Sequence, residues 1–157
     1  MEHEFYMDRA LALAKEAALD GEVPVGCVIV RDGVIVGEGR NRRETGRTAL
    51  GHAEIEAIRQ ACENLGGWRL WDCTLYVTLE PCPMCAGAII NARIPTVVFG
   101  ASDAKCGACG SVCDLFSMEF NHHPQRRKWQ PTPEIPETEK PGRVRPIRSQ
   151  SRTRLRD

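Results

Sequence analysis

The stretch TLYVTLEPCPMCAGA, residues 74–88, decides how this chain folds. Its first half, Thr74–Leu79, is rich in β-branched and aromatic side chains, which predicts a buried strand. Its second half carries Pro81 and Pro83, and the first turn of a helix tolerates proline because its N–H groups have no partner within the helix. We therefore predict a strand that runs directly into a helix over about residues 83–92.

Strands and helices alternate on both sides of this stretch. Apolar residues at helical spacing predict a helix over residues 4–20, and a second helix is predicted from His52 to about Leu65, where Gly66 ends it. An Asp-Gly pair at 32–33 predicts a hairpin turn. The remaining predicted segments are strands at Val25–Val30, Val34–Val36 and Pro95–Gly100, loops at Gly37–Gly51 and 101–114, and a short helical turn after Ser111. This alternation predicts an α/β fold in which helices cover a sheet.

Charge and proline content divide the chain at residue 123. The 21 basic and 21 acidic residues cancel over the whole chain, but residues 1–123 carry 11 basic and 17 acidic side chains, and residues 124–157 carry 10 and 4. The second part also holds six prolines and eight arginines and shows no apolar period. We predict one folded domain over residues 1–123 and a disordered Pro/Arg-rich tail over residues 124–157. The neutral total therefore excludes no polyanionic partner.

Eight cysteines are the other compositional feature of the chain. The acidic N-terminus lacks the basic and then apolar pattern of a secretory signal, and no run approaches the roughly 18 to 20 apolar residues that span a membrane. We therefore expect a cytoplasmic protein with no membrane partner. In a reducing compartment, cysteines favour a metal site over a framework of disulfides.

Three residues supply the ligand set of a catalytic zinc site. His52, Cys82 and Cys85 provide three protein ligands, which leaves the fourth position of a tetrahedral zinc ion open for water. Cys82 and Cys85 are three residues apart, so the first turn of the predicted helix places both on one face, and a helix N-terminus favours their thiolate form. Bound zinc lowers the pKa of water to about 7. We predict one Zn²⁺ per subunit.

Glu54 lies two residues after His52, where it can approach the zinc-bound water without being a ligand. This position suits a catalytic proton shuttle, which takes a proton from water and delivers it to the leaving group. Each feature alone has a simpler explanation: a structural histidine, a redox pair or half of a zinc knuckle, and a solvated helix glutamate. Together they form the signature of the zinc-dependent nucleobase deaminases.

The rest of the sequence narrows this signature to one family. Over about residues 4–123 the chain resembles the bacterial tRNA-specific adenosine deaminases, which belong to the cytidine deaminase-like superfamily. The stretches that carry the resemblance are GEVPVG at 21–26, GRN at 39–41, HAE at 52–54, the opening stretch at 74–88, VVFGA at 97–101, ASDAKCG at 101–107 and NH at 121–122. Residues 78–80 and 101–107 are typical of the tRNA branch, whereas purine-base deaminases usually diverge after the last zinc ligand.

The resemblance implies a fold, an activity and partners. The fold would be a three-layer α/β/α sandwich with a mixed central sheet. The activity would be hydrolytic deamination of adenosine to inosine at the wobble position of a tRNA anticodon stem-loop, in an arginine tRNA, with the target base turned out of a splayed loop. The protein would be a homodimer with each active site near the subunit interface.

The resemblance also implies which residues hold the target base. Asn41 would hydrogen-bond the flipped purine, Val25 would line its pocket, and Ala53 would offer backbone contacts. Structural explanations exist beside these: asparagine is common in turns, and valine is common in a core.

Four more residues would contact the RNA around that base. Asp103 and Lys105 would meet the flanking nucleotides and their backbone, and Asn121 and His122 would lie near the sugar and phosphate of the target nucleotide. The structural alternatives are that Asp103 caps a short helix and that Lys105 is an ordinary surface cation.

The end of the chain departs from the family and leaves alternatives open. After Asn121-His122 the family continues with a short strand and an amphipathic closing helix, which residues 124–157 cannot form. The tail is then either a basic arm that contacts phosphates or an ending without function, and a missing helix predicts uncovered apolar surface. The alternative functions are a small-molecule deaminase of guanine or cytosine and a zinc-binding subunit with little activity. We interpret the remaining cysteine cluster as free thiols rather than a second metal site: Cys106, Cys109 and Cys113.

Overall fold

The structure is a computed structural model that describes residues 2–131. Within those residues the helices are α1 (Glu2–Leu19), α2 (Ala53–Leu65) and α3 (Pro83–Asn91), with a short 3-10 helix, η1, at Leu115–Ser117. The strands are β1 (Gly26–Arg31), β2 (Val34–Arg40), β3 (Cys73–Leu79), β4 (Thr96–Ala101) and β5 (Gln125–Lys128). The predicted helices and the predicted strands all occur, with ends that differ by one to a few residues.

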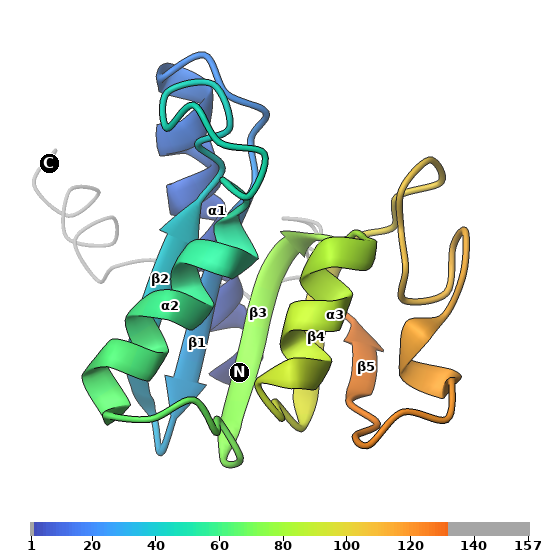
Figure 1. Cartoon of the computed structure of the whole chain (residues 1–157). Helices are drawn as coiled ribbons and strands as arrows, with labels where there is room; N and C mark the ends of the chain where they lie inside the picture. The colour runs from blue at the N-terminus through green and yellow to red at the C-terminus, as the bar shows by residue number, and fades with distance from the viewer. Residues whose placement is uncertain (1, 132–157) are drawn as a thin grey trace, which may run out of the picture.

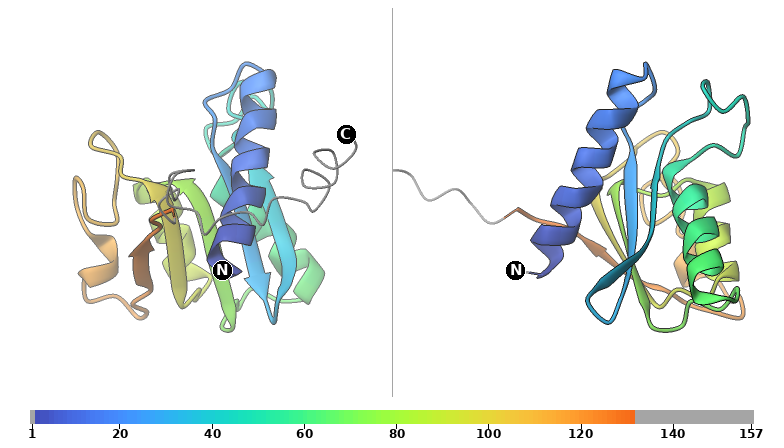
Figure 2. Two further views of the ribbon diagram at one scale, coloured as in Figure 1. Left: turned by 180° about the vertical axis from the view of Figure 1, so that it is seen from behind. Right: turned by 90° about the vertical axis from the view of Figure 1, so that its left-hand side faces the viewer.

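The five strands form one mixed sheet in the order β2-β1-β3-β4-β5. β1 runs antiparallel to β2 and β3, whereas β3, β4 and β5 are parallel to one another. α1 covers one face of the sheet, and α2 and α3 cover the other (Figures 1 and 2). This confirms the three-layer α/β/α sandwich. Because β3 and β4 are parallel, the loops that follow them leave the same edge of the sheet.

The β1–β2 hairpin turns at the predicted Asp-Gly pair. Asp32 and Gly33 have φ angles of 50° and 75°, as the two central residues of a type I′ turn require. The prediction of a loop from Gly37 onward is wrong, because β2 continues to Arg40. A Cβ atom at Gly37 would lie 2.3 Å from a backbone oxygen of α2, and one at Gly39 would lie 2.2 Å from another. These glycines therefore let α2 lie directly on the strand, although in the sequence they resemble loop residues.

The two faces of the sheet build two apolar clusters. Along β3, Leu75 and Val77 pack toward α2 and α3, whereas Tyr76 packs toward α1. The same alternation separates Val28 from Ile29 on β1, as the two-residue period of a strand dictates. These layers fix α2 and α3 side by side on one face of the sheet, which matters for the site. Among residues 2–131, no helix is long and apolar enough to cross a membrane.

The C-terminal part of the described chain corrects the predicted domain boundary at residue 123. Gln125–Lys128 pairs with β4 as a parallel edge strand, and the Trp129 N–H donates to the Phe99 carbonyl oxygen at 2.8 Å. All four residues of β5 are exposed, so backbone hydrogen bonds rather than burial hold this strand, and a search for apolar periodicity misses it. The predicted disordered tail and the absent closing helix otherwise concern residues 132–157, which lie outside the described part.

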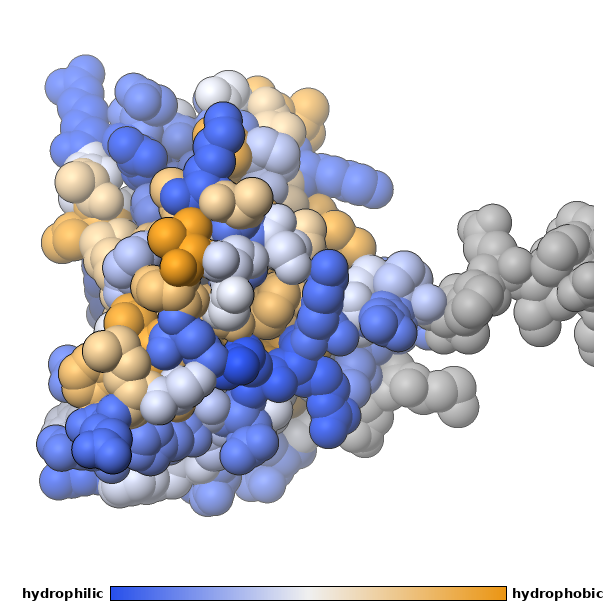
Figure 3. Space-filling model, turned by 90° about the vertical axis from the view of Figure 1, so that its right-hand side faces the viewer, coloured by the Kyte–Doolittle hydropathy of each residue, from blue (hydrophilic) through white to orange (hydrophobic). Residues whose placement is uncertain are grey.

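The side of the molecule that carries β5 and residues 102–121 has a mixed surface. Hydrophobic side chains gather into a patch there, beside strongly hydrophilic ones (Figure 3). Three large apolar residues of this segment are about half exposed or more, namely Val112, Met118 and Phe120. The segment therefore leaves apolar surface open next to α3.

Candidate metal and substrate site

Three potential metal ligands converge where two helices begin. His52 is the N-cap residue of α2, Cys82 is the N-cap residue of α3, and Cys85 follows in the first turn of α3. The Sγ atoms of Cys82 and Cys85 each lie 3.5 Å from Nδ1 of His52. All three ligand atoms lie within 4.8 Å of one another. The structure thus brings together the three residues that the sequence assigned to zinc.

This cluster fits a zinc ion in both donor chemistry and spacing. With Zn–S near 2.3 Å and Zn–N near 2.0 Å, tetrahedral ligands stand about 3.5 Å apart, which matches both sulfur–nitrogen distances. Three protein ligands leave one position open, as in catalytic rather than structural zinc sites. Among residues 2–131, no other group of three histidine, cysteine or acidic residues could hold a metal ion.

One of the two thiols, Cys82, is already in the form that binds a metal. A hydrogen bond from the Cys85 thiol lowers the pKa of Cys82 to about 5, and backbone N–H groups at the start of α3 add to this effect. The pKa of Cys85 is correspondingly raised by its bond to Cys82 and by burial. At neutral pH Cys82 is therefore a thiolate, the form that binds zinc.

Glu54 stands next to this cluster in the first turn of α2. It is 4% exposed and lines the same cavity as His52 and Cys82. Burial raises the pKa of Glu54 above its ordinary value, although a hydrogen bond with Cys85 and the charge of His52 oppose the shift. A raised pKa makes a carboxyl group a stronger base, and so better able to take up a proton and pass it on.

The cavity in front of the cluster has a volume of about 190 Å³. This is below the roughly 300 to 1,000 Å³ of sites for drug-sized ligands, so it suits a single base rather than a whole nucleotide. Of the residues that were predicted to contact substrate, those that line this cavity are Val25, Asn41, Ala53 and Asp103. The structure thus gathers four of the seven around the metal cluster.

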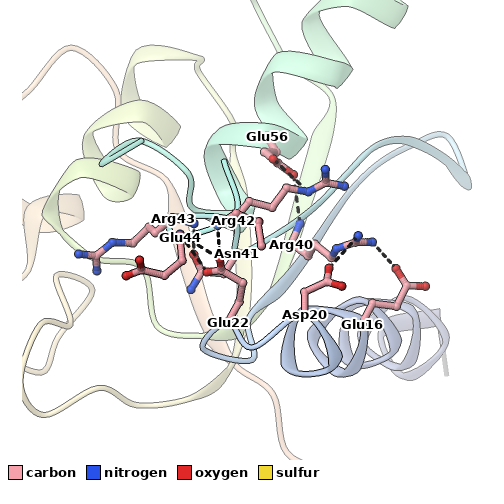
Figure 4. Close-up of polar contacts among 10 residues, drawn as sticks. Glu16, Asp20, Glu22, Arg40, Asn41, Arg42, Arg43, Glu44 and Glu56 are labelled. Atoms are coloured by element: carbon pink, nitrogen blue, oxygen red, sulfur yellow. Dashed lines mark hydrogen bonds and ion pairs between the residues drawn. The ribbon is translucent and has the colours of Figure 1, made fainter. Parts of the chain in front are cut away.

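Asn41 connects two segments of the cavity wall (Figure 4). Its Nδ2 donates to the Val23 carbonyl oxygen at 3.2 Å, and its Oδ1 accepts from the Arg43 N–H at 3.3 Å. Its own backbone N–H donates to the Val25 carbonyl oxygen at 3.1 Å. Asn41 therefore stabilises a turn. One N–H and one oxygen lone pair of its side-chain amide are left to bind a ligand.

Three of the predicted RNA-contacting residues lie outside this cavity. Lys105 is exposed, and its backbone N–H donates to Oδ1 of Asp103 at 3.0 Å. Asn121 lines a separate groove beside α3, and the His122 ring donates from Nε2 to the Ile94 carbonyl oxygen at 2.6 Å. Ile94 precedes β4, at the opposite end of that strand from Asp103. The contacts expected for these three residues with RNA stay predictions.

Two buried carboxylates escaped the sequence analysis. Glu22 is 6% exposed and accepts from the backbone N–H groups of Glu44 at 2.9 Å and Thr45 at 2.7 Å (Figure 4). Glu80 is 3% exposed, and although burial alone would raise its pKa, hydrogen bonds from residues 103–111 lower it. Each carboxylate holds a loop that contributes to one side of the cavity. Both residues lie in stretches that carry the family resemblance, but the N–H groups that they bind are too far away in the sequence for this role to be predicted.

None of the eight cysteines forms a disulfide, and this includes the cluster at residues 106–113. Cys106 is exposed at the cavity, whereas Cys109 is buried, and burial raises its pKa to about 12. Among the described residues, neither Cys109 nor its neighbours Cys106 and Cys113 belong to a group of three potential metal ligands.

Deaminases are among the known proteins that we found to be similar to this chain. A family model of MafB19-like deaminases matches residues 1–135. A tRNA-specific adenosine deaminase of Bacillus subtilis is 51% identical over 120 residues, which cover 76% of this chain and 74% of that protein. A solved structure from a study of A-to-I editing by tRNA:A34 deaminases is 44% identical, with a TM-score of 0.78 over 82% of this chain and all of that chain. The guanine deaminase of Bacillus subtilis is 34% identical, with a TM-score of 0.65 over 98% of this chain and 94% of that chain.

Proposed function

This chain belongs to the family of tRNA-specific adenosine deaminases, and we propose that it converts the wobble adenosine of a tRNA anticodon stem-loop to inosine. The observation that carries the proposal is the placement of Glu54 in one small cavity with the His52, Cys82 and Cys85 cluster. The net reaction replaces the C6 amino group of adenine with an oxygen atom from water and releases ammonia. The substrate we propose is an arginine tRNA, and a tRNA substrate places the activity in the cytoplasm.

The residues of the cluster would hold one zinc ion per subunit, and zinc, when bound, supplies an acidified water at neutral pH. In the proposed mechanism Glu54 takes a proton from the attacking water and passes it to the purine ring. A second proton, moved by the same carboxyl group, reaches the departing amino group, which leaves as ammonia. Because Glu54 is almost fully buried, these transfers occur away from bulk solvent, which favours return of the proton to substrate rather than its loss to water.

The cavity walls select the base and the RNA around it. We propose that the free N–H of the Asn41 amide bonds the purine, that Val25 packs against the ring, and that the Ala53 backbone contributes polar contacts. The base must be turned out of the anticodon loop to enter, because a cavity of about 190 Å³ admits no stacked neighbour. Asp103 also lines the cavity, and we propose that the flanking nucleotide passes it.

The outer contacts of the RNA are a further part of the proposal. Lys105 is exposed on the loop that carries Asp103, so its ammonium group can reach a phosphate of the anticodon loop. Asn121 and His122 lie away from this subunit's cavity, so they would contact the RNA only along a path that leaves the cavity. Replacement of Lys105 by alanine tests its role through the salt dependence of RNA binding, which a cationic phosphate contact steepens. Replacement of Asn121 or His122 by alanine tests their roles through RNA affinity.

We propose that the protein acts as a homodimer. A groove beside α3 is lined by apolar residues that include Met84, Leu115 and Phe120, and Phe120 is 47% exposed. Open apolar surface of this kind marks an interaction site. Sedimentation analysis should therefore give the mass of two chains, and Phe120→Asp should shift the protein toward the monomer.

A small-molecule base deaminase is the second candidate function. It is supported by the likeness to the guanine deaminase of Bacillus subtilis, at 34% identity over nearly the whole chain. The tRNA deaminase relatives are more similar, at 51% and 44% identity, and we therefore favour the RNA substrate. A zinc-binding subunit without activity is disfavoured, because such a site has no use for a buried carboxyl group such as Glu54 beside its ligands.

The proposal is tested with a set of substrates. The full chain is supplied with zinc and incubated with an anticodon stem-loop that has adenosine at the wobble position, and the RNA is digested and analysed for inosine. Free adenosine, guanine and cytosine are incubated in parallel, and a stem-loop with its adenosine moved into the stem is the matched control. Inosine only from the wobble adenosine is the expected result. Deamination of a free base, with none in the stem-loop, would show that the proposed function is wrong.

A further inference from the structure

Glu80 lies two residues before Cys82, and its carboxylate accepts several hydrogen bonds from the loop at residues 103–111. Oε1 accepts from the Asp103 N–H at 3.2 Å and from the Ser111 hydroxyl group. Oε2 accepts from the Cys109 N–H at 3.0 Å and from the Ser111 N–H at 3.2 Å. Three backbone groups and one side chain of residues 103–111 therefore converge on a single buried side chain.

The loop also closes tightly around this carboxylate. The Gly107 N–H donates to the Asp103 carbonyl oxygen at 2.9 Å, and the Ala108 N–H donates to the Pro81 carbonyl oxygen at 2.9 Å. A Cβ atom at Gly107 would lie 2.2 Å from Oε2 of Glu80 and 2.5 Å from the Asp103 oxygen. Any residue other than glycine would therefore push the loop off the carboxylate.

The same loop supplies one wall of the cavity. Asp103 and Cys106 line the cavity, and Lys105 projects from the exposed part of the loop between them. Glu80 lies directly before Pro81 and Cys82, so one short segment connects the metal cluster with the wall. The distance between the reacting centre and the wall is thus set through Glu80.

We infer that Glu80 is a positioning residue for RNA recognition, because its carboxylate holds the 103–111 loop at the place where the nucleotide that flanks the target base must pass. The inference rests on the proposed function. Glu80 also lines the cavity itself, and in this role it acts through the loop that it holds. Loss of the Glu80 carboxylate should lower the affinity for RNA while the metal cluster and Glu54 still carry out the reaction.

The test compares three variants of the full chain. Glu80→Gln keeps the shape of the side chain but turns one oxygen into an NH₂ group that faces N–H donors. Ser111→Ala is milder, since it removes one hydroxyl donor and leaves the carboxylate, so it reports on the loop even where Glu80→Gln folds poorly. Glu63→Gln removes a carboxylate of the same size from the exposed face of α2 and is the matched control.

Three quantities are measured on each variant. Zinc content shows whether Cys82 is still in place, hydrogen exchange reports the amides of residues 103–111, and fluorescence anisotropy gives the affinity for the anticodon stem-loop. Steady-state rates then separate KM from kcat. For Glu80→Gln we expect full zinc content, exchange of the loop amides at least about tenfold faster, and stem-loop binding about tenfold weaker, with KM raised and kcat changed less. Ser111→Ala should change the same quantities in the same direction by a smaller factor, and Glu63→Gln should change none.

Unchanged stem-loop affinity in Glu80→Gln, with the loop amides exchanging faster, would overturn the inference, because the loop would then have moved without consequence for RNA. Unchanged exchange would overturn it as well. If the normal chain does not deaminate the stem-loop, the proposed function is wrong, and the inference is still judged on affinity and exchange, which need no turnover.

Discussion

The metal cluster and the walls of the cavity are built by different means. His52, Cys82 and Cys85 are fixed by regular structure, because His52 and Cys82 directly precede the first residue of a helix and Cys85 lies in the first turn of α3. The walls include two loops, each held by one buried carboxylate. Glu22 binds the loop that contains Glu44 and Thr45, and Glu80 binds the loop at residues 103–111. The chemistry of the site therefore depends on short-range geometry, and its selectivity depends on hydrogen bonds between residues far apart in the chain.

Substitutions in the metal cluster and in the cavity walls should therefore have different effects. A ligand at a helix start has little freedom to move, because the helix packs on the sheet through the apolar cluster that Ala57, Leu75 and Ile89 share. A loop held by one carboxylate can be moved by a single substitution without disturbing the core. We expect changes in the cluster to abolish the reaction and changes in the walls to alter the substrate that reaches it.

The largest effect is expected from removal of a ligand. Cys82→Ala removes one of three donors, so zinc affinity and deaminase activity should both fall below detection. Zinc content by mass spectrometry and inosine formation check this. Cys106→Ala, which removes an exposed thiol of the cavity wall, is the control and should keep its zinc. If Cys82→Ala has normal activity, the cluster is structural and does not carry out the chemistry.

The next largest effect is expected at Glu54. Glu54→Ala should keep its zinc and lose roughly 10²- to 10⁴-fold in kcat, the usual contribution of a positioned acid–base group. Single-turnover deamination of the stem-loop measures it, together with zinc content and RNA affinity. Turnover that survives this change would rule out the proton transfers assigned to Glu54.

A smaller effect is expected where a wall is loosened. Glu22→Gln replaces one of two acceptor oxygens that bind the Glu44 and Thr45 N–H groups. A hydrogen bond to a charged group contributes about 1.5–3 kcal/mol, so the free energy of unfolding should fall by about that amount. Urea denaturation measures this, and steady-state rates should show KM for the stem-loop raised with kcat nearly unchanged. A loss of kcat alone would mean that this wall serves the chemistry and not the selection of RNA.

The smallest effect is expected from pH. The pKa of Glu80 is lower in the folded protein than its ordinary value of 4.5, so its ionisation stabilises the fold above that value. The stabilisation is lost as the pH falls through the folded-state pKa, because protonation removes the negative charge that the N–H groups of the loop bind. The difference in unfolding free energy between the normal chain and Glu80→Gln should therefore shrink below pH 4.5. If the difference in unfolding free energy stays constant down to about pH 3, the ionised carboxylate of Glu80 does not hold the loop.

The same contrast explains what the sequence can predict. The ligands and Glu54 follow from local rules, namely a Cys-x-x-Cys pair at a helix start and a glutamate two residues after a histidine. The Asp32-Gly33 turn follows from a local rule as well. These short-range patterns need no knowledge of the rest of the fold, and in the structure the residues lie close together.

The features that were missed depend on distant partners. Glu22 and Glu80 bind N–H groups 22 to 31 residues away. Both lie in stretches that carry the family resemblance, but the sequence does not show which distant N–H groups they bind. β5 was missed because its residues are polar and exposed on both faces, so only its pairing with β4 defines it. Gly37 and Gly39 were interpreted as loop residues because the sequence does not show that α2 packs on them.

One competition experiment tests directly whether this cavity selects an adenosine within RNA. The full chain with zinc is given the wobble-adenosine stem-loop and free guanine at equal concentration in one vessel, and inosine, xanthine and ammonia are measured together over time. We predict that inosine accumulates with one ammonia for each inosine while guanine stays unchanged. Xanthine that forms with matching ammonia, while the adenosine of the stem-loop persists, would contradict this prediction.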